Sequence, residues 1–136
     1  MIRRVDHFGI AVDSIAEARK FWESLGLEVA AVEEVPQEGV RVAMIALGEL
    51  RIELLEPTRP DSPVAKFLGR RGPGLHHLCL ASDDLEADDA ALRAGGVELL
   101  RERPTAGAGG VRVQFVHPKS AGGVLVELSQ GREEPE

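Results

Sequence analysis

The strongest constraint on the fold of this chain is an internal repeat that relates its two halves. The segment His7–Val12 lines up with His77–Ser82, and a glycine follows nineteen residues after each leading histidine. Each half then closes on a similar apolar stretch with one glutamate at its centre, Glu53 in the first half and Glu127 in the second. Because three landmarks recur in the same order, the sequence predicts two copies of one supersecondary unit.

The residue pattern of each copy predicts a strand, a helix and then three strands. In the opening segments large apolar residues alternate with the histidine and its small neighbours, which is the period of a strand. A helix then begins near Ser14 in the first copy and near Asp83 or Asp84 in the second, and glycine ends both. The large residues therefore face the helix, and the histidine face stays open. The later strands are expected at Val40–Leu47, Arg51–Leu55, Val111–Val116 and Val124–Leu128.

These elements predict an α+β fold in which two tandem βαβββ modules form one cleft-shaped mixed sheet. The modules span about residues 4–57 and 75–130 of a single domain. The linker, 58–74, contains a short helix with Ser62 as its cap and Pro63 in its first turn. The acidic tail, 131–136, is expected to be solvated.

Composition narrows the class of protein. The 136 residues carry a net charge of −7, which argues against a nucleic-acid partner because such proteins normally show a basic patch. No apolar run is long enough to span a membrane, so no membrane partner is expected. The single cysteine, Cys79, cannot form an internal disulfide, and nothing in the sequence calls for an oxidising compartment. A cytoplasmic protein that acts on a small molecule fits these features.

The repeated histidine and glutamate predict a metal site. Two copies packed around a shared cleft would make His7 equivalent to His77, and Glu53 equivalent to Glu127. Taken alone, a strand histidine is usually structural and a strand glutamate usually faces solvent. A carboxylate within an apolar strand is costly to bury unless a cation accompanies it, and here the pattern occurs twice. Two imidazoles and two carboxylates suit one divalent first-row metal or Mg²⁺, whereas a closed structural zinc site would normally use thiolates.

The repeat, with a histidine on its first strand and a glutamate on its last, resembles the vicinal oxygen chelate superfamily, whose fold is glyoxalase-like. Within it, the chain is similar over about residues 4–130 to the methylmalonyl-CoA epimerase family. The phrases that carry this resemblance are 52–58, 61–68, 74–78 and 117–128.

The resemblance implies an enzyme that interconverts (R)- and (S)-methylmalonyl-CoA. A proton α to the thioester would be removed, giving an enolate that a metal stabilises. The family's metal ligands map onto His7, Glu53 (glutamine in some members), His77 and Glu127. Cobalt, manganese or magnesium would occupy the site, one ion per chain. The family also implies a cytosolic homodimer in propionyl-CoA metabolism.

The proton-transfer groups are less completely specified. Glu127 is expected to act in proton transfer as well as in metal binding. Some relatives carry a second glutamate where this chain has Val42, which cannot transfer a proton. Glu38, His76 and a metal-bound water remain alternatives for the opposing base. Lys119, His117 and Lys66 are the expected contacts of the acyl-CoA substrate.

Two other functions are compatible with the same fold. A glyoxalase-type lyase acting on a glutathione hemithioacetal would use a similar metal site. A non-catalytic drug-binding module would need no metal, and the four ligand positions argue against it.

Overall fold

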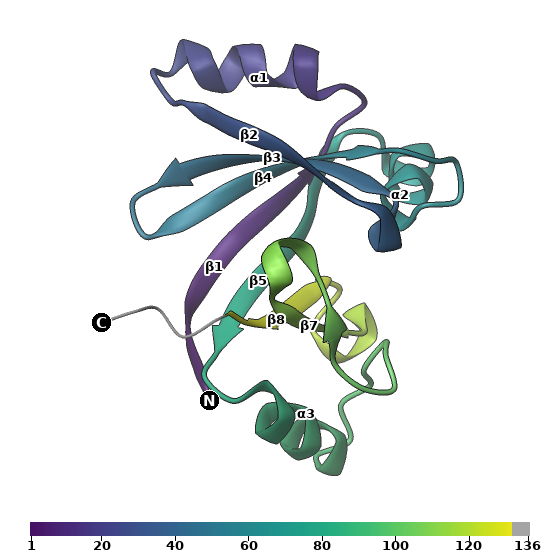
Figure 1. Cartoon of the computed structure of the whole chain (residues 1–136). Helices are drawn as coiled ribbons and strands as arrows, with labels where there is room; N and C mark the ends of the chain where they lie inside the picture. The colour runs from purple at the N-terminus through teal and green to yellow at the C-terminus, as the bar shows by residue number, and fades with distance from the viewer. Residues whose placement is uncertain (132–136) are drawn as a thin grey trace. The chain divides into compact units, whose positions relative to one another are not determined.

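The predicted repeat is present in the computed structural model of the chain (Figure 1), which describes residues 1–131. The chain divides into two compact units. The first unit comprises residues 7–76, and the second combines residues 1–6 with the chain from residue 77 onward. The predicted tail, 131–136, lies outside the described residues from residue 132 on. Among the described helices, none has the length and apolarity needed to cross a bilayer.

The first unit builds a mixed sheet in the order β2-β3-β4-β1. The strands β2, β3 and β4 are antiparallel neighbours, and β1 joins β4 in parallel. Its elements are β1 (Ile2–Ala11, whose first residues count with the second unit), α1 (Ile15–Ser24), β2 (Val29–Val35), the 3-10 turn η1 (Pro36–Glu38), β3 (Val40–Leu47), β4 (Leu50–Pro57) and α2 (Pro63–Arg71).

One face of this sheet packs on α1, which lies against β2 and β4 (Figure 1). Ile45 and Leu54 are fully buried there, and Ile15 of the helix is nearly so. The opposite face carries His7 and Glu53, because β1 and β4 run in register with His7 beside Arg51 and Gly9 beside Glu53. The prediction that the histidine face lies opposite the helix is confirmed for this unit.

The second unit repeats this plan with the strand order β5-β8-β7-β6. The strands β5 and β8 are parallel, and the remaining neighbours are antiparallel. The strand β6 is only two residues long, since the segment around it is rich in glycine and proline. The elements are β5 (Gly74–Ser82), α3 (Leu85–Ala94), β6 (Thr105–Ala106), η2 (Ala108–Gly110), β7 (Arg112–Val116), η3 (Pro118–Ser120) and β8 (Val126–Gln130).

Each unit has an additional helix cap that the sequence alone did not indicate. Besides Ser14, whose hydroxyl accepts a hydrogen bond within the first turn of α1, the carboxylate of Glu56 accepts one from the Ile15 amide at 2.8 Å. In the second unit Gln130 accepts one from the Leu85 amide at the same distance. Both acceptors stand three residues after the repeated glutamate, so the start of each helix is hydrogen-bonded to the end of the strand that carries this glutamate.

The helix ends match as well. Gly26 and Gly96 both have φ of +84°, a conformation that residues with a Cβ rarely adopt. The predicted cap of α2 is also confirmed, because the Ser62 hydroxyl accepts a hydrogen bond from the Ala65 amide at 3.0 Å. Local sequence signals therefore fixed the helix boundaries correctly.

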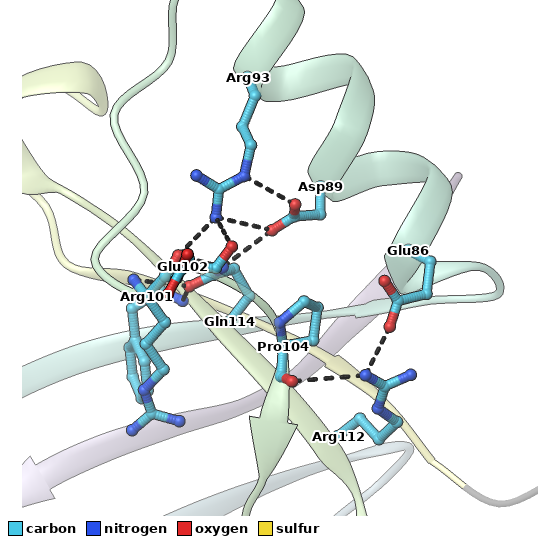
Figure 2. A network of polar contacts seen from close by, with 9 residues as sticks. Glu86, Asp89, Arg93, Arg101, Glu102, Pro104, Arg112 and Gln114 are labelled. Atoms are coloured by element: carbon cyan, nitrogen blue, oxygen red, sulfur yellow. Dashed lines mark hydrogen bonds and ion pairs between the residues drawn. The ribbon is translucent and has the colours of Figure 1, made fainter.

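A polar network ties α3 to the loop that precedes β6 (Figure 2). Asp89 accepts hydrogen bonds from Arg93 and from the fully buried Gln114, both at 2.8 Å. The Arg93 guanidinium also donates to the carbonyls of Arg101 and Glu102. Burial alone would raise the pKa of Asp89, but the hydrogen bonds from Arg93 and Gln114 outweigh it and hold that pKa below its ordinary value. The equivalent pair on α1, Arg19 with Glu23, lies on the surface.

Candidate metal centre

The first unit holds one of the two predicted ligand pairs. His7 comes from β1 and Glu53 from β4, and each is only 6% exposed. The His7 Nδ1 atom lies 3.3 Å from the Glu53 Oε2 atom. The parallel register of the two strands puts both side chains on the same face, with Gly9 beside Glu53.

The second unit holds the other pair in an equivalent setting. His77 comes from β5 and Glu127 from β8, and Cys79 stands beside Glu127 as Gly9 stands beside Glu53. The His77 Nε2 atom lies 3.1 Å from the Glu127 Oε1 atom, and the two side chains are 8% and 12% exposed. Each unit therefore brings a histidine and a carboxylate together on the sheet face opposite its helix.

Each pair has neighbours that hold it in place. In the first unit the Arg51 guanidinium lies 3.3 Å from Glu53 Oε2, the same oxygen that meets His7. In the second unit Phe115 is in register with Glu127, and its ring meets His77 edge to face at 6.5 Å between centroids. The Arg101 guanidinium covers that phenyl ring at 4.7 Å.

The sequence indicates only one of these three neighbours. Arg51 is expected on the face of Glu53, because residues two apart in a strand share a face. Phe115 required the register between β7 and β8. Arg101 lies in the loop before β6, whose path depends on the network around Asp89 (Figure 2).

The chemistry of the donor set fits a divalent ion. Neutral imidazole and carboxylate are ligands of first-row metals, and carboxylate also suits Mg²⁺. The buried thiol of Cys79 donates a hydrogen bond to the Ser129 hydroxyl at 3.2 Å. Burying both carboxylates is costly unless cationic groups accompany them, and a bound ion would supply that charge.

The residues predicted for proton transfer at the second position are distributed over different elements. Glu38 is half-buried at the end of η1. Val42, which cannot transfer a proton and stands where some relatives carry a second glutamate, is 2% exposed within β3. His76 lies on β5, where its ring meets the Phe67 ring of α2 edge to face at 5.0 Å. His76 therefore has a packing role in the first unit whatever else it does.

The residues predicted to bind the substrate also have distinct settings. His117 caps η3, because its Nδ1 atom accepts a hydrogen bond from the Lys119 amide at 3.0 Å. The Lys119 side chain is exposed at that turn, and Lys66 is exposed on α2. Both lysines are thus accessible to an anionic ligand.

Comparison with known proteins places this geometry in context. The family model described as the Glyoxalase/Bleomycin resistance protein/Dioxygenase superfamily matches residues 6–115. An ethylmalonyl-CoA/methylmalonyl-CoA epimerase from Cereibacter sphaeroides is 41% identical over 133 residues, which cover 96% of this chain and 99% of that protein.

Solved structures give the same comparison in three dimensions. A variant of the Streptomyces coelicolor methylmalonyl-CoA epimerase in complex with 2-nitronate-propionyl-CoA superposes with a TM-score of 0.92 at 38% identity, covering 97% of this chain and 99% of that one. A methylmalonyl-CoA epimerase in complex with methylmalonyl-CoA and NH4+ gives a TM-score of 0.93 at 38% identity, covering 98% and 97%. The similarity extends over nearly the whole of each chain.

Proposed function

The chain belongs to the Glyoxalase/Bleomycin resistance protein/Dioxygenase superfamily and, within it, to the methylmalonyl-CoA epimerase family, and on this premise we propose that it interconverts the two epimers of methylmalonyl-CoA. The observation that carries the proposal is the pair of equivalent, buried histidine–carboxylate contacts, one in each unit. Epimerisation requires a stable arrangement of cation-binding and proton-accepting groups, and these four side chains are of the right chemistry.

We propose further that His7, Glu53, His77 and Glu127 together bind one divalent ion per chain, with Co²⁺, Mn²⁺ and Mg²⁺ as the expected occupants. The two units would then act as a single catalytic domain, each contributing one histidine and one carboxylate. When bound, such an ion supplies electrostatic stabilisation of the negative charge that develops on the thioester oxygen.

Glu127 is the proposed proton-transfer residue on one side of the α-carbon. Its carboxylate is mostly buried and held by His77, so its position is fixed before the substrate arrives. A carboxylate in such a setting can accept the α-proton of one epimer, while a proton donor on the opposite side of the α-carbon completes the inversion. On the other side Val42 has no acid–base function, and Glu38, His76 or a water molecule remain alternatives.

The substrate itself is an acyl-CoA, which carries several negative charges. Lys119, His117 and Lys66 are the proposed contacts of its CoA portion. The accessibility of the two lysines supports this assignment, and so does the position of His117 directly before η3. We also propose a homodimer in the cytoplasm, where the lone thiol of Cys79 would remain reduced.

One experiment tests the proposed function directly. Methylmalonyl-CoA is incubated with the protein in deuterated water, with and without added Co²⁺, and label at the α-carbon is followed by mass spectrometry. We expect catalytic label uptake that chelation abolishes and Co²⁺ restores. Absence of label uptake by the Co²⁺-loaded protein would contradict the epimerase function, and turnover of a glutathione hemithioacetal instead would favour a lyase.

A further inference from the structure

We propose that Arg51 is a positioning residue of the metal centre, which orients the Glu53 carboxylate for the ion by binding one of its two oxygens. This inference rests on the metal site proposed above and adds to it a residue outside the ligand set. The guanidinium would act through Glu53 and would not itself bind the ion.

The placement of Arg51 follows from strand geometry. It precedes Glu53 by two residues on β4, so both side chains emerge on the same face of the sheet. The register with β1 sets Arg51 directly beside His7. Arg51 therefore lies on the ligand face of the first unit and next to both members of the pair.

The contact itself is selective for one oxygen. Arg51 Nη2 and His7 Nδ1 each lie 3.3 Å from Glu53 Oε2. Both of these contacts fall on the same carboxylate oxygen, which would leave Oε1 as the atom to coordinate an ion. A group that occupies one oxygen of a ligating carboxylate fixes the rotamer of the side chain and the direction of its remaining lone pairs.

Arginine is well suited to this task. Its guanidinium is planar, always charged and more weakly hydrated than an ammonium group, so it can pair with a carboxylate in a partly buried setting. Glu53 is 6% exposed, and its charge needs a partner whether or not an ion is present. Arg51 is 40% exposed along its side chain, so it can deliver that charge without being fully desolvated itself.

A matched arginine on the neighbouring strand provides the control. Arg41 lies on β3 with a side-chain exposure of 41%, close to that of Arg51. It also pairs with carboxylates, at 2.5 Å to Glu56 and 3.2 Å to Glu34, but neither of these is a proposed ligand. Replacing either arginine with methionine removes its charge and its ion pairing while keeping a long, unbranched side chain.

The test measures metal affinity directly and does not depend on turnover. Co²⁺ is titrated calorimetrically into the metal-free wild-type protein and into Arg51→Met, Arg51→Lys and Arg41→Met, after thermal melts have shown that each variant is folded. We expect the Kd for Co²⁺ to rise about 10–100-fold in Arg51→Met, the cost typical of losing an outer partner of a metal ligand. Arg51→Lys should recover part of the loss, and Arg41→Met should bind as the wild type does.

The outcomes separate this inference from the function on which it rests. If Arg51→Met binds Co²⁺ as tightly as the wild type, or more tightly, Arg51 does not position Glu53. An equal loss in Arg41→Met would show a general effect of charge and would also overturn the inference. Wild-type protein that binds Co²⁺ but takes up no label from deuterated water would contradict the epimerase function alone.

Discussion

At the scale of single residues, the repeated His and Glu carry most of the functional information in this chain. Either pair alone would have an ordinary structural explanation, because strand histidines often pack in cores. The pairs become informative because both contacts, His7 with Glu53 and His77 with Glu127, are buried and lie on equivalent strands. Predictions at this scale concern which of the four side chains bind an ion and which also transfer a proton.

The first prediction concerns metal binding by His77. His77→Ala removes an imidazole from the proposed ligand set. Loss of a residue that only supports a ligand weakens metal binding about 10–100-fold, so the loss of Co²⁺ affinity in this variant should be larger. Elemental analysis after dialysis would measure the remaining occupancy. Full occupancy of one ion per chain in this variant would exclude His77 from the site.

The second prediction separates metal binding from proton transfer. Glu127→Gln keeps the size and one oxygen donor but removes the negative charge and most of the basicity. With Co²⁺ in excess, its rate of label exchange at the α-carbon should fall by about 100-fold or more, the range for loss of a general base. The rate would be followed by mass spectrometry in deuterated water.

Glu53→Gln is the matched control for that variant, because it makes the same chemical change in the equivalent position of the repeat. It should retain much of its exchange activity once saturated with Co²⁺. If both variants lost activity equally under these conditions, Glu127 would be a ligand only. The proton acceptor would then have to be sought at Glu38 or His76.

At the scale of elements, the sequence predicted helices better than the strands of the second unit. Helix boundaries depend on local chemistry, such as the Ser62 cap and the left-handed Gly26, and these signals are readable in a single sequence. The short β6 and the path of the preceding loop depend on contacts made by Asp89 and Gln114, residues far apart in the sequence. The caps in which Glu56 and Gln130 accept hydrogen bonds from helix amides also require the strands to be in place first.

The third prediction concerns the Asp89 network and its dependence on pH. The pKa of Asp89 is lowered in the folded protein, so its charge contributes stability above the pKa of the unfolded chain and loses that contribution as pH falls through the folded pKa. Asp89→Asn should lower the free energy of unfolding at pH 7 by about 1–3 kcal/mol, because a buried charged hydrogen-bonding group is lost.

Urea denaturation at several pH values would measure this effect. The difference between Asp89→Asn and the wild type should shrink as pH falls from about 5 into the range below the ordinary aspartate value of about 3.9. A surface aspartate such as Asp61 offers a control, since Asp61→Asn should change stability little at any pH. A constant difference across the whole pH range would mean that the charge of Asp89 is not responsible.

At the scale of the whole molecule, the fourth prediction concerns assembly. The strand β2 ends the sheet order of the first unit. Phe21 of α1 is 60% exposed, and Leu25, which directly follows this helix, is 58% exposed. Unpaired strand edges and exposed apolar side chains favour association with a second copy. We expect a homodimer mass in sedimentation equilibrium across the micromolar range. A monomer mass that does not change with concentration would contradict this.

The equivalent ion pairs of the two helices have a consequence for how this protein evolves. Twelve and sixteen residues after each leading histidine, α1 carries Arg19 and Glu23 on its surface, whereas α3 carries Asp89 and Arg93. If the repeat arose by gene duplication, the two helices began with the same pair and only one of them came to hold a loop. Substitutions at 19 and 23 would then have little effect on stability, while those at 89 and 93 would remove the hydrogen bonds that hold the segment before β6. Substitutions should therefore accumulate faster at positions 19 and 23 of α1 than at positions 89 and 93 of α3.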